Sequence, residues 1–252
     1  MTKLFSWVVI CFLLACHSPS TTESFPPAHR EQRDNFQECV GEGCATVELI
    51  YPVFAGDTRL AGLLNRQVEG QHLRMWISGD QQYREMEEAI DSFFKDYRVF
   101  RNDYPQVMQE WTFETNARVT HQSDSLISIR FENFSYLGGA HPNTVVAYLN
   151  LKGDGEVLER GQLLIDGEGL LELAREKFKE HHQVEPGTRL EEDGRFFLDD
   201  GAFFLPATMG YEGNEFVLLY NAYEIGPYVM GRTELRFPLK ELAGVVYSGG
   251  PG

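Results

Sequence analysis

The sequence predicts an α+β fold in which helices pack against a mostly antiparallel sheet. In some segments apolar residues recur at spacings of three and four, which is typical of helices with one buried face. In most other segments apolar and polar residues alternate, which is typical of strands. Short polar turns separate these strand-like segments, so neighbouring strands are expected to pair antiparallel. The length and composition suit one large domain or two subdomains.

The first half of the chain alternates between strand-like and helix-like segments. Residues 45–52 carry apolar side chains at every second position and are predicted to form a strand. Asp57 and Asp80 can each cap a helix, and the apolar stripe of the second helix reaches Tyr97. We interpret this stripe as a core face. The sequence Asn-Asp-Tyr-Pro at 102–105 ends the second helix, because proline disfavours helical backbone in the residue before it.

The second half is dominated by short segments with the pattern of strands. These are residues 110–120, 126–136, 144–151, 195–205 (as a hairpin), 216–223 and 233–237. Two helices are expected among them, one from Gly169 to His182 and a shorter one from Pro238 to Leu242. This mixture of helices and hairpins supports the α+β prediction.

The N-terminal residues 1–15 have the layout of a secretory signal, in which Lys3 precedes an apolar run too short to span a bilayer. The run ends in Leu-Leu-Ala before Cys16, which resembles a lipobox, so Cys16 is the expected lipidation site. The alternative is an ordinary signal followed by a chance cysteine. Residues 16–38 begin with a segment rich in Ser, Thr and Pro and are predicted to be a flexible tether. We therefore expect a protein of the cell envelope, lipid-anchored in a membrane and either periplasmic or surface-exposed.

The chain is strongly acidic, with a formal net charge of −16. This charge argues against a nucleic-acid partner, and against binding to anionic lipid headgroups through clusters of basic side chains. It favours a cationic partner or no charged partner at all.

Two cysteines, Cys39 and Cys44, lie between the expected lipidation site and the predicted first strand. They flank the sequence Val-Gly-Glu-Gly, and in an oxidising compartment such a pair is predicted to form a disulfide. A metal site would need further ligands nearby, and a redox pair favours the Cys-x-x-Cys spacing. We therefore expect neither a metal site nor a cofactor.

The most distinctive stretch is Gly-Gly-Ala-His-Pro-Asn, which contains Gly138, Gly139, His141 and Asn143. Two glycines permit backbone conformations that other residues avoid, and the proline constrains the turn. The stretch can be a tight crossover loop in which His141 caps backbone groups. Alternatively it is a ligand site, with His141 as a base and Asn143 as a hydrogen-bonding partner.

A second stretch, Tyr-Glu-Ile-Gly-Pro-Tyr, contains Tyr223, Glu224 and Tyr228 at a Gly-Pro bend. It can be a strand break with buried tyrosines, or Glu224 and Tyr228 can line a groove together with His141. A hydrolase acting on envelope polymers through His141, Glu224 and Tyr228 is one hypothesis. The sequence has no Gly-x-Ser-x-Gly elbow, no His-Glu-x-x-His motif and no P-loop, so we assign no catalytic residue.

Taken together, several stretches of the chain resemble a known family of extracytoplasmic domains. The resemblance is carried by residues 135–143, 161–164, 195–201, 223–231 and 235–239. Their order and spacing are similar to those of the extracytoplasmic domain of the anti-sigma factor RsiV, which also occurs beside the N-terminal domain of the peptidoglycan deacetylase PdaC. The segment from Val47 to Tyr104 looks like the companion domain that precedes it.

The resemblance implies a companion subdomain at residues 39–104, an RsiV-like α+β domain at 105–247 and a short tail at 248–252. It also implies binding, because in RsiV this region binds host lysozyme, whereas in PdaC the chemistry lies in a separate deacetylase domain. We expect neither that deacetylase domain nor a transmembrane helix here, so deacetylation and sigma-factor release are not carried over.

The expected function is therefore a non-catalytic binding module at the envelope, for a cationic lysozyme-like protein or for cell-wall glycan. The hydrolase described above and a purely structural envelope component are the alternatives.

Overall fold

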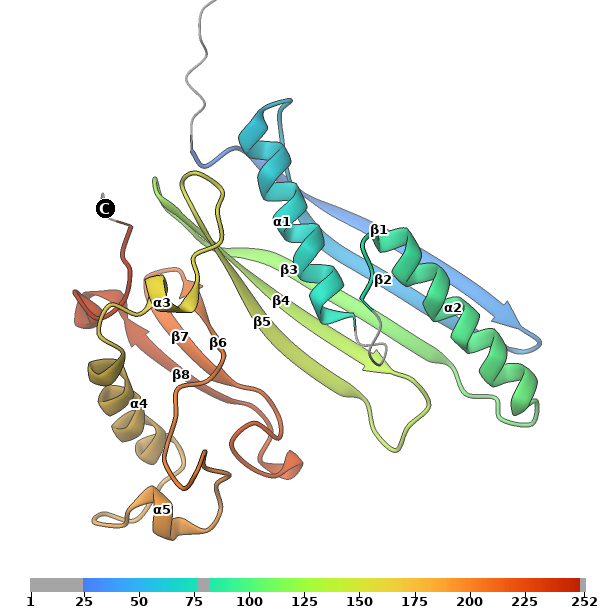
Figure 1. The fold of residues 1–252 in the computed structure, drawn as a ribbon. Helices are drawn as coiled ribbons and strands as arrows, with labels where there is room; N and C mark the ends of the chain where they lie inside the picture. Colours follow the sequence, from blue (N-terminus) through green and yellow to red (C-terminus); the bar gives the residue numbers. More distant parts are fainter. Residues whose placement is uncertain (1–24, 77–81, 250–252) are drawn as a thin grey trace, which may run out of the picture.

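The computed structural model describes residues 25–76 and 82–249. Figure 1 shows a long five-stranded sheet with helices α1 and α2 on one face, and beside it a smaller three-stranded sheet with helix α4. This is an α+β fold with mostly antiparallel strands, as the sequence predicts. Within these two described ranges, no helix is both long and apolar enough to cross a membrane.

The large sheet has the strand order β1-β2-β3-β4-β5. Neighbouring strands are antiparallel except for β2 and β3, which run parallel because the two helices connect them. The strands are β1 (His29–Val40), β2 (Gly43–Phe54), β3 (Trp111–Gln122), β4 (Leu126–Tyr136) and β5 (Asn143–Lys152). The disulfide Cys39–Cys44 closes the hairpin of β1 and β2, which confirms its prediction.

Helices α1 (Arg59–Met75) and α2 (Met86–Asp103) cover one face of the large sheet, because each presents one apolar stripe to it. Buried residues of α1, such as Leu64, pack against an aliphatic cluster on β4 and β5. Buried residues of α2, such as Phe93 and Tyr97, pack in a mainly aromatic cluster over β2 and β3. The stripe predicted from the sequence is therefore a core face.

The two predicted helix caps have different outcomes. Thr58, rather than the neighbouring Asp57, caps α1, and its hydroxyl accepts a hydrogen bond of 3.1 Å from the backbone N–H of Ala61. The predicted cap Asp80 lies outside the described residues. Helix α2 begins instead after Glu85.

The small sheet has the order β6-β7-β8 and is antiparallel throughout. Its strands are β6 (Thr208–Glu212), β7 (Glu215–Tyr220) and β8 (Thr233–Pro238). Helix α4 (Gly167–His181) buries Leu170, Ala174 and Phe178 against this sheet. Short helical segments complete this half: α3 (Arg160–Leu163), α5 (Leu190–Asp193), η1 (Tyr228–Met230) and η2 (Leu239–Leu242).

Edge strand β6 is bound by polar side chains of the large sheet. The hydroxyl of Ser128 accepts a hydrogen bond of 3.0 Å from the backbone N–H of Tyr211, and the amide of Asn150 donates one of 3.0 Å to the carbonyl of Met209. Thr120 donates a third, of 2.7 Å, to the carbonyl of Tyr211. Because strand side chains alternate between faces, Ser128 lies on the face of β4 opposite to the helices. The two sheets are thus joined by polar side chains that satisfy the backbone of an edge strand, next to a buried apolar cluster of Val146, Val217 and Leu219.

A network of charges continues this junction. Arg130 on β4 forms ion pairs with Glu212 (3.0 Å) and Glu234 (3.3 Å) of the small sheet, and only 8% of its side chain is exposed. Tyr148 on β5 donates a hydrogen bond of 2.6 Å to Glu212, which also pairs with Arg236 at 2.7 Å. Burial would raise the pKa of Glu212, but the hydrogen bonds from Tyr148, Arg236 and Arg130 lower it to about 2. Glu212 is therefore a carboxylate at neutral pH.

Glycine at position 210 allows this contact. A side chain at Gly210 would overlap the ring of Tyr148, which lies directly on the backbone of β6. The close approach of ring and strand therefore requires a residue without a Cβ.

Several element predictions differ from the structure. The tether predicted for residues 16–38 ends earlier, because β1 begins at His29; its side chains are mostly exposed, so no apolar alternation marks it. The subdomain boundary predicted near residue 104 falls inside the large sheet, which pairs β2 with β3. The hairpin predicted at 195–205 is wrong, since only a single bridge between Asp199 and Ala202 forms there. Strand β6 was not predicted.

We expect Arg130→Met to lower the free energy of unfolding by about 2 kcal/mol, because it removes the charged hydrogen bonds of a nearly buried guanidinium to Glu212 and Glu234, although Arg236 still pairs with both carboxylates. Urea unfolding followed by circular dichroism measures this loss. The matched control is Arg98→Met, which removes an exposed ion pair with Glu38 and should cost less than about 1 kcal/mol. Equal losses in the two variants would contradict a structural role for the network.

Candidate functional site

The two stretches singled out in the sequence meet in space. His141 lies in the loop between β4 and β5, and Tyr228 lies in the connection between β7 and β8. Their rings stack with centroids 4.4 Å apart and an interplanar angle of 24°. Tyr223 extends the row, with its ring centroid 5.4 Å from that of Tyr228. We call these three side chains, His141, Tyr223 and Tyr228, the aromatic platform.

The aromatic platform is exposed. Tyr223 is 56% exposed, Tyr228 is 39% exposed, and the adjoining Val229 is 91% exposed. Of the two alternatives for this bend, the one with buried tyrosines is therefore wrong. Tyr223 also has a positive φ of 69°, a backbone conformation that is rare for a residue with a bulky side chain. Exposed aromatic groups gathered on one surface are typical of binding sites.

Hydrogen bonds to one carbonyl hold the two loops together. Nδ1 of His141 lies 3.0 Å from the carbonyl oxygen of Pro142, and the hydroxyl of Tyr228 donates to the same oxygen over 3.4 Å. The histidine ring is thus oriented by its own loop and stacked by the neighbouring one. This combines the two alternatives for His141, because it contacts backbone within its loop and also forms part of an exposed surface.

The glycines of the first stretch shape its loop. Gly138 has a φ of +81°, and a Cβ there would lie 2.9 Å from Oε1 of Gln109 and 3.3 Å from Nε1 of Trp111. Both the conformation and the space therefore favour glycine at this position. Gly139 has neither constraint, and Asn143 is the first residue of β5, paired with Ser135. We assign these residues to the loop rather than to the platform.

Glu224 has a different position from the one expected of a catalytic acid. Its two carboxylate oxygens accept hydrogen bonds from the backbone N–H groups of Ala207 (3.1 Å) and Asn221 (2.8 Å). The carboxylate therefore fastens the connection between β7 and β8 to the segment before β6. This role favours positioning of the loop over acid–base chemistry with His141.

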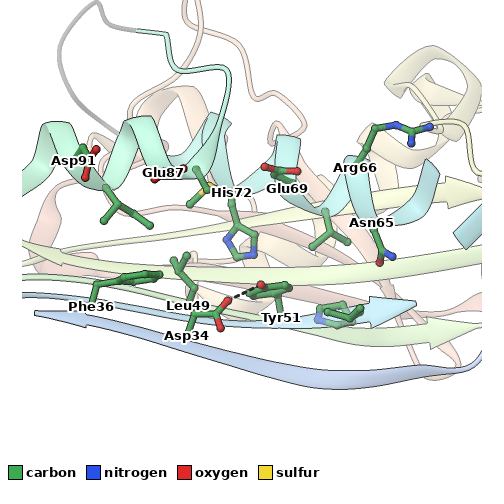
Figure 2. Close-up of a pocket in the computed structure, with 15 residues that line it drawn as sticks. Asp34, Phe36, Leu49, Tyr51, Asn65, Arg66, Glu69, His72, Glu87 and Asp91 are labelled. Atoms are coloured by element: carbon green, nitrogen blue, oxygen red, sulfur yellow. Dashed lines mark hydrogen bonds between the residues drawn. The ribbon is translucent and has the colours of Figure 1, made fainter. Parts of the chain in front are cut away.

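A pocket that the sequence did not predict lies in the other half of the molecule. It opens between helices α1 and α2 above strands β1 and β2 and has a volume of about 740 Å³. Figure 2 shows His72 reaching from α1 toward Tyr51, whose hydroxyl donates a hydrogen bond of 2.6 Å to Asp34. His72 is only 3% exposed, and neither of its ring nitrogens has a hydrogen-bond partner among the residues that the structure describes. No sequence motif marks the pocket, because its residues come from four separate elements.

Burial lowers the pKa of His72 to about 4, so the ring is neutral at pH 7. In the unfolded chain a histidine has a pKa of about 6.5, so as the pH falls the unfolded state takes up the proton first. The contribution of His72 to the free energy of unfolding should therefore decrease as the pH falls from about 6.5 to about 4, by at most about 3 kcal/mol.

We expect His72→Phe, which keeps a ring of similar shape, to remove this part of the pH dependence. Urea unfolding at about pH 7 and pH 4.5 measures the difference. The matched control is His29→Phe at an exposed position of β1, which should keep the slope of the parent protein. An unchanged slope in His72→Phe would show that the buried ring does not cause it. The same experiment tests whether the ring can be replaced without loss of stability at neutral pH.

Comparison with known families agrees with the sequence resemblance. The family model described as deacetylase PdaC matches residues 40–144, and the model DUF3298, described as a protein of unknown function, matches residues 163–240. No curated protein matches the chain.

Solved structures of DUF3298 proteins have a similar fold. One, from Pseudomonas aeruginosa PAO1, has a TM-score of 0.63 and 18% identity, covering 90% of this chain and 97% of its own. Another, from Bacteroides fragilis NCTC 9343, has a TM-score of 0.62 and 19% identity, covering 88% of this chain and 95% of its own. At these identities the likeness concerns the fold.

The fold and the two domain matches define a class, the envelope-associated extracytoplasmic proteins. Within that class, the chain carries a PdaC-type domain followed by a DUF3298 domain. The aromatic platform uses both, since His141 lies in the first matched region and Tyr223 and Tyr228 lie in the second. It is therefore a feature of the junction between the domains, a frequent place for binding sites.

Proposed function

We propose that the protein is a lipid-anchored, non-catalytic binding protein of the envelope, which holds its partner on the aromatic platform. The observation that carries this proposal is the stacking of His141 on Tyr228 at an exposed surface made by both domains. Tyrosine side chains supply large contact areas at binding surfaces with little loss of conformational freedom. The carboxylate of Glu224 accepts hydrogen bonds from two backbone N–H groups, which supports a non-catalytic role for this residue and for the site.

A lysozyme-like protein is the first candidate partner. Lysozymes of the chicken type are cationic, and the net charge of −16 on this chain provides the complementary sign. Opposite charges speed the encounter of two proteins, while the buried contacts determine how long the complex lasts.

Cell-wall glycan is the second candidate, and a specific observation favours it. Tyr223 and Tyr228 expose their rings side by side, with centroids 5.4 Å apart, and a sugar ring has an apolar face that can lie on such a surface. A glycan would depend on the rings and only weakly on charge, so its binding should vary little with salt.

We expect Tyr228→Ala to weaken the binding of chicken-type lysozyme at least tenfold, equivalent to about 1.4 kcal/mol, because the variant removes the central ring of the platform. Calorimetry with the chain from Phe25 onward, at low and at physiological salt, measures the affinity. Leu173→Ala on α4 removes a comparably exposed apolar side chain and is the matched control.

Lysozyme binding by Tyr228→Ala and Tyr223→Ala that is as strong as the binding by the parent protein would contradict the platform as the binding surface. Absence of lysozyme binding, together with binding of soluble peptidoglycan fragments that Tyr228→Ala abolishes, would favour the glycan. Absence of both would contradict the proposed function.

The lipid anchor is tested separately. We expect the full chain to partition into membranes when expressed in bacteria, and Cys16→Ser to release it, because a diacylated cysteine gives stable anchoring. Mass spectrometry of the N-terminal peptide detects the acyl chains directly. A parent protein whose N-terminal peptide carries no acyl chains on Cys16 would contradict lipidation at this residue.

A further inference from the structure

The pocket beneath α1 and α2 has the shape and lining of a small-molecule site. Its volume of about 740 Å³ lies within the range typical of ligand pockets, which is roughly 300–1,000 Å³. Leu49 from β2, Val68 from α1 and Ile90 from α2 provide buried apolar walls. Because these walls belong to the sheet and to both helices, the pocket is part of the folded framework.

The imidazole ring of His72 is, among the described residues, an unpaired polar group in the wall of the pocket. His72 lines it, is 97% buried and, within residues 25–76 and 82–249, makes no hydrogen bond through either ring nitrogen. Its ring contacts are aromatic, with Tyr51 and Phe131 edge-on at 5.4 and 5.1 Å between centroids. A buried donor and acceptor without partners carries a cost in free energy that a ligand with a hydrogen-bonding group would remove.

The opening of the pocket is acidic. Four carboxylates and one arginine line it: Asp34, Glu69, Glu87, Asp91 and Arg66. Figure 2 shows these side chains on the helices and the sheet around His72. Across the part of the chain that the structure describes, none of these four carboxylates forms an ion pair. Asp34 is held in place by the hydroxyl of Tyr51 and by Gln32. The electrostatic potential at this opening therefore favours a cation.

We propose that this pocket binds a small organic cation: an apolar body between α1, α2 and the sheet, a hydrogen-bonding group that reaches His72, and a protonated amine among the carboxylates at the opening. The buried histidine without a partner and the carboxylates without counter-charges support this assignment independently of each other. The site is separate from the aromatic platform, and the proposal does not rest on the function proposed for the platform.

Three related compounds test the two parts of the proposal. Tyramine has an aromatic body, a phenol hydroxyl and an ammonium group; tyrosol replaces the ammonium group with a hydroxyl; phenethylamine lacks the phenol hydroxyl. We expect tyramine to bind about tenfold more tightly than tyrosol because of the carboxylates, and about threefold to tenfold more tightly than phenethylamine because of His72. Titration of the chain from Phe25 onward, followed by amide shifts in NMR spectra, measures these affinities and locates the site.

Variants then assign each preference to its residues. The double variant Asp34→Asn/Glu69→Gln should bring tyramine close to the affinity of tyrosol while leaving tyrosol unchanged. His72→Phe should bring tyramine close to the affinity of phenethylamine. The matched control Glu172→Gln/Glu180→Gln removes the same two charges from exposed positions of α4 and should change neither preference.

Three results would overturn the proposal. One is equal affinity of tyramine and tyrosol, and another is the absence of saturable tyramine binding in the millimolar range. The third is a set of amide shifts confined to residues outside α1, α2, β1 and β2. Because the charge variants alter only side chains at the opening of the pocket, loss of folding would not obscure these outcomes.

Discussion

The junction between the two sheets depends on one arrangement, the covering of edge strand β6 by the polar face of the large sheet. Ser128 and Asn150 satisfy backbone groups of β6 that would otherwise be open to water or to another chain. Arg130, whose side chain is only 8% exposed, pairs with Glu212 and Glu234, which gives the contact a defined geometry. This contact adds to the buried apolar cluster of Val146, Val217 and Leu219, which also joins the PdaC-type and DUF3298 domains.

The aromatic platform follows from the same junction. Asn221, at the start of the connection between β7 and β8, exchanges hydrogen bonds of 2.8 and 3.0 Å with the backbone of Val146 on β5. This fixes one loop relative to the other, so that His141 from the first domain can stack on Tyr228 from the second. The pocket around His72 does not depend on this junction, since it lies between helices α1 and α2 and strands β1 and β2.

The sequence identified both halves of the platform as distinctive stretches and associated His141 with Tyr228. It left alternatives open at two features. One alternative had the tyrosines buried at a strand break, but Tyr223 is well exposed on a backbone of positive φ. The hydrolase alternative placed Glu224 in a groove with His141, but the carboxylate binds backbone N–H groups. Both outcomes depend on loop conformation, which a pattern of residue types does not determine.

The sequence by itself determined the α+β class, most helices and strands, the disulfide and the family resemblance. These features leave local signals: apolar periodicity, cysteine spacing and motif order. The existence of strands β1 and β6 and of the pocket became evident only from the tertiary structure. Strand β1 is an exposed edge without alternation, β6 is short and held by side chains from distant strands, and the pocket gathers residues from four elements. Their physical causes are contacts between residues far apart in the chain, which no local pattern records.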